Sequence, residues 1–145
     1  MGALSSSRLA AATALVCLAA ALSACLTVQS GDLFLITRTG AGSRLTLLVN
    51  DGGTVRCNGG AAKPLPDKLL LQARDLATTL DNDAKNRLNI PRTANTVALY
   101  TVKLKDGTIS FPDTAARTHS ELAQLELLAV QIAQGPCASP LVRRR

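Results

Sequence analysis

The stretch VALYTVKLKDGTISFP, residues 97–112, decides the fold of this chain. In residues 97–104 apolar and polar side chains alternate loosely, which is the pattern of a strand with one buried face. Asp106 and Gly107 follow, a pair typical of a two-residue hairpin turn in which both positions need positive φ. Residues 108–111 then lead back. The stretch therefore predicts an antiparallel β-hairpin in the second half of the chain.

Three more strands are predicted closer to the N-terminus. Residues 33–38 have strand composition, and the two glycines within residues 39–43 interrupt them. Residues 45–50 are apolar at nearly every position, which is typical of a central strand. Residues 51–53 turn the chain, and residues 54–57 run back. The three strands predict a three-stranded meander ahead of the hairpin.

The first predicted helix lies between the meander and the hairpin. Apolar residues recur at intervals of three and four from Leu69 to Leu80, behind Pro64 and Pro66 at the helix entrance. The opposite side is polar, so we expect one buried stripe. Residues 81–95 are polar and rich in turn formers, and they are expected to form a surface loop.

The second predicted helix follows the hairpin. Thr118 and Glu121 have the spacing of a capping box, a leucine-rich stripe comes next, and Gly135 and Pro136 end the helix. The element order is therefore βββ-α-ββ-α. We expect the α+β class, with an antiparallel sheet of about five strands and both helices on one face.

The N-terminus has the layout of a secretory signal. Residues 9–22 are free of charge and follow a single cation, Arg8. The run is shorter than the roughly 20 residues that cross a bilayer. We expect a signal peptide over residues 1–24, a tether over 25–31, one α+β domain over 32–138, and a basic tail over 139–145.

The end of the signal, Leu22-Ser23-Ala24-Cys25, resembles the lipobox of bacterial lipoproteins. The resemblance implies that Cys25 is acylated and becomes the first mature residue. Membrane lipid would then be a partner, and the protein would be anchored on the extracytoplasmic face of a bacterial cell membrane. The alternative is a secreted protein, cut at an Ala-x-Ala-like site, in which Cys25 has no special role.

Two cysteines remain for the mature body. Cys17 leaves with the signal and Cys25 is assigned to lipid, so Cys57 and Cys137 are expected to pair in an oxidising compartment. Closing a loop of about 80 residues is worth roughly 4 to 5 kcal/mol in the chain-entropy model. His119 is the only histidine, so we expect no metal site.

Charge and composition argue against nucleic acid as a partner and against catalysis. The formal charge of +6 includes one cation in the signal, Arg8, and three in the tail, Arg143 to Arg145, which leaves about +2 for the body. Aromatic residues make up 2% of the chain, too few for base stacking. His119 could be drawn into a catalytic triad, but its place at a helix start favours an exposed polar residue. We expect no enzyme activity and no cofactor.

Residues 33–134 resemble, in the order and spacing of their motifs, the emfourin-type metalloprotease inhibitors. The motifs are Ile36-Thr37-Arg38-Thr39-Gly40, Leu65-Pro66-Asp67, Tyr100-Thr101-Val102, Asp106-Gly107, Phe111, Asp113 and the leucine-rich last helix. The resemblance implies a small α+β domain that inhibits thermolysin-like proteases. The family's Arg-Ser-Gly-Gly is here Arg38-Thr39-Gly40-Ala41, and the same element order also resembles several uncharacterised lipoprotein domains.

Two functions are therefore expected. The first is a membrane-anchored, non-catalytic binding module that inhibits an extracellular metalloprotease through a loop between two strands. The alternative is a structural or accessory envelope protein that binds another protein or a wall polymer. The candidate binding loop comprises Arg38, Thr39, Gly40, Ala41, Gly42 and Ser43. Its glycines permit close approach to a partner, although an ordinary hairpin turn would have the same composition.

Overall fold

A computed structural model describes residues 27–139 of the chain. The predicted signal peptide, Cys25 and residues 140–145 of the predicted tail lie outside the described residues. The elements in chain order are β1 (Asp32–Gly40), β2 (Ser43–Asn50), β3 (Thr54–Cys57), β4 (Ala62–Pro64), α1 (Asp67–Thr79), α2 (Asp81–Lys85), β5 (Ala98–Lys103), β6 (Thr108–Pro112), the 3₁₀ helix η1 (Asp113–Arg117) and α3 (Ser120–Gln134).

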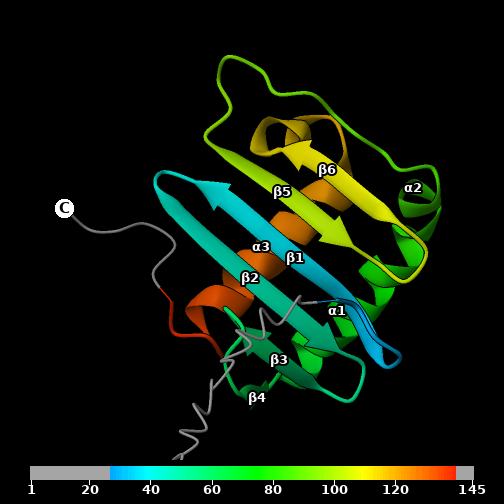
Figure 1. The fold of residues 1–145 in the computed structure, drawn as a ribbon, viewed down its shortest axis with the longest axis vertical. Coiled ribbons are helices and arrows are strands. Elements are labelled where there is room, and N and C mark those ends of the chain that lie inside the picture. The colour runs from blue at the N-terminus through cyan, green and yellow to red at the C-terminus, as the bar shows by residue number, and fades with distance from the viewer. Residues whose placement is uncertain (1–26, 140–145) are drawn as a thin grey trace, which may run out of the picture.

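The strands form one antiparallel sheet in the order β4-β3-β2-β1-β5-β6 (Figure 1). The meander and the hairpin are joined where β1 pairs with β5. The sheet has six strands where about five were expected, and the additional strand is β4, an edge strand of three residues. Pro64 is tolerated there because an edge strand has one side without partners. Leu65 N donates to Gly53 O at 2.9 Å, which holds the end of β4 beside the β2–β3 turn.

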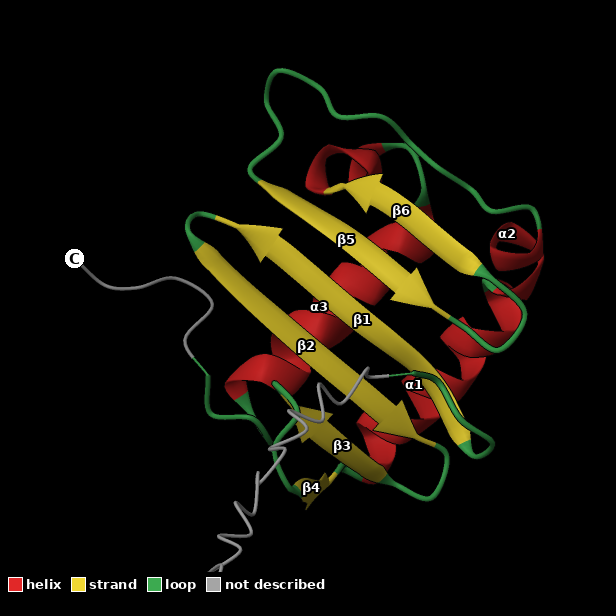
Figure 2. Cartoon of the chain, in the orientation of Figure 1, coloured by secondary structure: helices red, strands yellow, loops and turns green. Residues whose placement is uncertain are grey.

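The long helices α1 and α3 lie on the same side of the sheet (Figure 2). The short helix α2 lies at the β6 end of the sheet. The loop after it runs alongside β6, where Ile90 N donates to Ser110 O and Ser110 N donates to Leu88 O. Among residues 27–139 the other side of the sheet carries no helix, and we call it the open face. The chain is thus of the α+β class, as predicted.

The core fills the space between the sheet and the helices. Every second residue of the central strands points into it, for example Leu45, Leu47 and Val49 of β2, all at most 6% exposed. Apolar residues of α3 meet them from the other layer, and these are Leu122, Leu125, Leu128, Ala129, Ile132 and Ala133. The period of two in the strands and the period near 3.6 in the helices thus build one hydrophobic core.

The predicted disulfide is confirmed: Cys57 at the end of β3 is bonded to Cys137 just beyond α3. Their Cα atoms are 5.8 Å apart, and the two residues are separated by 80 positions in the sequence. Cys57 pairs in register with Leu47, so it lies on the helix-covered side of the sheet. The disulfide therefore joins the sheet to the segment just after the last helix, α3.

Two local predictions were wrong. Asp106 and Gly107 join β5 to β6, but neither has positive φ; the turn runs over four residues, and Leu104 N donates to Gly107 O at 2.9 Å. Gly107 is needed for a different reason, because a Cβ there would overlap the carbonyl oxygen of Ala84 in α2. Helix α3 begins one residue later than the capping box implies, with His119 as its N-cap and no side-chain cap.

Candidate binding site

The predicted binding loop is shorter than the sequence suggested. Arg38, Thr39 and Gly40 belong to β1, and Ser43 begins β2. Only Ala41 and Gly42 form the turn, with φ of 50° and 72° respectively. Two consecutive positive φ values are typical of a type I′ hairpin turn. The stretch is thus a tight turn between paired strands and not an extended loop, and its role in binding stays a prediction.

The two glycines of this stretch have different surroundings. A Cβ on Gly40 would overlap the carbonyl oxygen of Val97 and lie 2.9 Å from the Cα of Ala98, its register partner on β5. Gly40 therefore allows β1 and β5 to stay paired to their ends. A Cβ on Gly42 would meet nothing within 4 Å. Of the two, only Gly42 has free space in which a partner could approach.

Arg38 lies on the helix-covered side of β1, next to the aromatic residues at the rim of the core. Its Nε donates to the hydroxyl oxygen of Tyr100 at 3.3 Å, and its Cζ is 6.0 Å from the centroid of the Tyr100 ring. Tyr100 in turn stacks on Phe111, with centroids 5.2 Å apart and ring planes 9° from parallel. These contacts restrict the arginine side chain at one end of the sheet.

Two carboxyl groups lie near Tyr100, the residue that Arg38 contacts. Asp113, at the start of η1, accepts hydrogen bonds from the backbone N of Val97 and of Ala98, at 3.2 to 3.3 Å. Glu126 comes from α3, and its Oε1 is buried with no hydrogen-bond partner among the described residues. Burial, together with the negative charge of Asp113, raises the pKa of Glu126 to about 7, and the charge of Arg38 partly offsets this. Glu126 is therefore only partly ionised at neutral pH.

Burial also raises the pKa of the Tyr100 phenol, with a further contribution from the charge of Glu126. The hydrogen bond from Arg38 acts in the opposite direction. Tyr100 thus stays a neutral hydroxyl that can accept from Arg38. Within residues 27–139 the guanidinium makes no ion pair and no hydrogen bond other than the one to Tyr100. Its remaining N–H groups can bind a carboxylate or a backbone carbonyl oxygen from outside.

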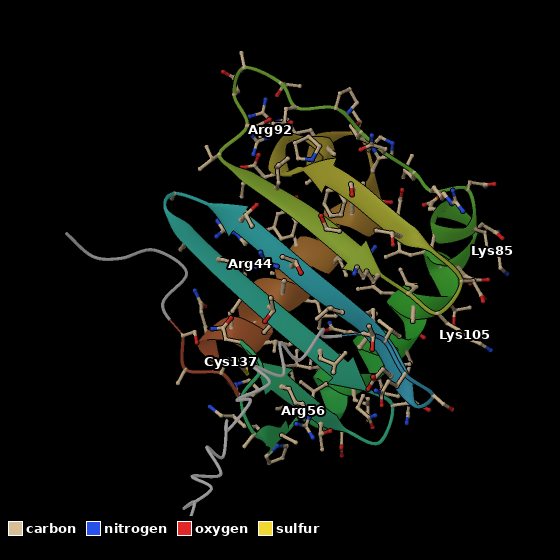
Figure 3. All side chains as sticks on the ribbon, in the orientation of Figure 1. Arg44, Arg56, Lys85, Arg92, Lys105 and Cys137 are labelled. Carbon is tan, nitrogen blue, oxygen red and sulfur yellow. A yellow bond between two sulfur atoms is a disulfide. The ribbon has the colours of Figure 1, made fainter. Side chains whose placement is uncertain are left out.

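The open face has a different chemistry. Register places hydroxyl side chains of four strands in one row across it: Thr46, Thr37, Thr101 and Ser110. Three cations share the face, Arg44 of β2, Arg56 of β3 and Lys103 of β5, and all three are exposed. Figure 3 labels Arg44 and Arg56.

The row of hydroxyl side chains on the open face could not be predicted from the sequence, because it depends on the pairing of strands far apart in the chain. The signal that could have found it is the alternation within each strand, such as Arg44 and Thr46 either side of a buried leucine.

The described residues include no group of three or more His, Cys, Asp or Glu side chains arranged to hold a metal ion. Over the same residues, no helix is long and apolar enough to span a bilayer. His119 Nδ1 lies 2.9 Å from the hydroxyl of its neighbour Thr118 and 3.4 Å from Ala115 O. These contacts are local to the start of α3.

No protein-family model matches this chain, and neither the curated proteins nor the solved structures contain a significant match.

Proposed function

We propose that this protein is a non-catalytic binding module, anchored through acylated Cys25 to the extracytoplasmic face of a bacterial cell membrane. Its partner is proposed to be another protein, namely an extracellular metalloprotease of the thermolysin-like class. The lipobox-like sequence Leu22-Ser23-Ala24-Cys25 supports the anchor. The order of motifs over residues 33–134 supports the class of partner.

The single observation that carries the binding proposal is the setting of Arg38. Its side chain is restricted by Tyr100, whereas most of its hydrogen-bond donors have no acceptor among the described residues. A side chain that is already ordered loses little conformational entropy when a partner binds. The Ala41-Gly42 turn lies three residues further along and is exposed at both positions. Arg38 and this turn together would form the contact with the protease.

The first experiment tests the anchor. We expect Cys25→Ala to abolish acylation, so that the protein is left unprocessed or is shed from the membrane. Detergent phase partitioning of the wild type and the variant measures this directly. A variant that partitions into detergent and is processed like the wild type would show that Cys25 is not the lipidation site.

The second experiment tests the partner. We expect the wild type to inhibit a thermolysin-like protease stoichiometrically and Arg38→Ala to weaken inhibition by about tenfold, which is about 1.4 kcal/mol. Arg44→Ala is the matched control, because Arg44 lies beside the same turn but on the open face. If the wild type is simply digested, the structural or accessory envelope role becomes the better account. Equal effects of both substitutions would place the contact away from Arg38.

A further inference from the structure

The N-terminal segment of the described chain lies on the open face. Figure 1 shows it in front of the sheet, on the side away from α1 and α3. Thr27 lines a groove of about 800 Å³ with Leu48 and Arg56, and also a second hollow of about 360 Å³ with Lys103 and Thr108. Because these two hollows flank β1 on the open face, the segment crosses the sheet over β1.

Leu35 supports this path. It pairs in register with Leu48 on one side and Lys103 on the other, so it belongs to the open face and not to the core cluster. It is nevertheless only 4% exposed. A leucine on an uncovered sheet face would be accessible, so we attribute its burial to the segment that starts at Thr27.

The segment is fixed to the sheet by hydrogen bonds. Gln29 N donates to Asp32 Oδ2 at 3.0 Å, and Asp51 N donates to Gly31 O at 2.8 Å. Cys25 is two positions before Thr27, with only Leu26 between them, and two steps of extended chain reach at most about 7 Å. Cys25 is thus tied by a very short connection to the middle of the open face.

The charged side chains of the strands are mostly positive, as expected for a surface that binds anions. Asp32 is the only acidic residue in the six strands, and its carboxylate already accepts from Asn50 Nδ2 at 3.0 Å and from Gln29 N. Arg44, Arg56 and Lys103 are exposed on the open face, and none of them forms an ion pair within residues 27–139. Such cations are attracted by the phosphates of anionic lipids within a Debye length.

We propose that the open face of the sheet rests against an anionic phospholipid bilayer, so that the helix layer points away from the membrane. This inference rests on the proposed acylation of Cys25. The short connection fixes which side of the body meets the lipid, and Arg44, Arg56 and Lys103 bind the headgroups. Arg38 and its carboxyl neighbours lie on the helix-covered side and stay accessible to a protein partner.

The test uses the full-length protein, purified in detergent and added to preformed vesicles, with one new cysteine at a time. Thr46→Cys reports on the open face, and Gln124→Cys on the exposed side of α3 is the matched control. A membrane-impermeant maleimide labels each variant in phosphatidylglycerol vesicles and in detergent. We expect vesicles to slow labelling at position 46 by about fivefold or more and at position 124 by less than about twofold, since an anionic maleimide is repelled by anionic headgroups within a Debye length of about 10 Å.

A second variant tests the contribution of charge. Arg44→Ser, Arg56→Ser and Lys103→Ser, combined with Thr46→Cys, should still float with the vesicles but lose most of the protection in phosphatidylglycerol. Equal protection at positions 46 and 124 would overturn the proposal. Protection at position 46 in native membranes but not in vesicles would also overturn it, because a protein would then cover the face. A wild type that does not float with vesicles would instead refute the acylation on which the orientation depends.

Discussion

The two faces of the sheet are built from alternate residues of the same strands, yet they differ sharply. On the covered face Phe34, Ile36 and Leu47 are fully buried against the helices. On the open face the neighbouring positions Thr37 and Leu48 stay partly exposed, and Leu35, at 4% exposed, is the exception. A period of two therefore lets one strand serve the core with one set of side chains and the surface with the other. Substitutions on the covered face should change stability, and substitutions on the open face should change contacts.

The largest effect on the covered face is expected from removing the disulfide. In the variant Cys57→Ala with Cys137→Ala, the unfolded chain regains the entropy of an open loop of about 80 residues, and the chain-entropy model gives a loss of about 4 kcal/mol. The free energy of unfolding in urea, measured without reductant, checks this. A loss below about 1 kcal/mol would mean that the bond contributes little to holding the helix layer on the sheet.

Adjacent leucines of β2 give the sharpest comparison of the two faces. Leu47 is fully buried, so Leu47→Ala should cost about 3 kcal/mol through lost contacts and a residual cavity. Leu48 lies on the open face, and Leu48→Ala should cost less than about 1 kcal/mol. Denaturant melts of the two variants measure the difference. Similar losses would contradict the assignment of the faces.

The pH dependence of stability tests the surroundings of Glu126, at the edge of the covered face. Its pKa is raised to about 7 from an ordinary value of 4.5, chiefly by burial. Its protonated form is favoured in the folded state, so the contribution to stability is full below pH 4.5 and is lost as the pH rises to about 7. Because the group is half exposed, solvent screening limits the effect to about 1 kcal/mol.

Glu126→Gln should remove this dependence, so that the variant gains stability relative to the wild type between pH 5 and pH 8. Thermal melts of both proteins at the two pH values give the comparison. An unchanged difference between the two proteins across that range would refute the raised pKa.

The smallest effect belongs to the β1–β2 turn, which is part of neither face. Ala41 has φ of 50°, a conformation that a residue with a Cβ adopts at some cost, and Asn followed by Gly is the preferred type I′ pair. Ala41→Asn should therefore stabilise the protein by about 0.5 kcal/mol. Gly42→Ala is the control and should destabilise it by about 1 kcal/mol. A loss of stability in Ala41→Asn would contradict the turn type.

The sequence predicted the elements that are long and periodic. The strands β1, β2, β3, β5 and β6, the helices α1 and α3 and the disulfide follow from alternation, spacing and the cysteine count. It missed β4 and α2, which have three and five residues. Neither shows a periodic pattern, and both are fixed by contacts with the rest of the fold, such as the approach of Ala84 to Gly107. The four-residue β3 was predicted because glycine-rich turns bound it on both sides.

For the candidate site, the sequence indicated Arg38 and the Ala41-Gly42 turn but not the side chains that surround Arg38. Arg38 was named from its place beside a glycine-rich turn. Its contact with Tyr100 bridges 62 residues of sequence, and Glu126 comes from the last helix. The register of β1 with β5 decides which side of β1 bears Arg38 and brings it to Tyr100. Helix packing decides that Glu126 lies near it. Neither can be obtained from residue types alone.

The mass of the N-terminal peptide tests most directly whether acylated Cys25 holds the proposed binding module on a membrane. Digestion of the membrane-associated protein, followed by mass spectrometry, is expected to give a peptide that begins at Cys25 and carries a diacylglyceryl group. A peptide that begins at another residue, or that contains Cys25 without lipid, would contradict the account.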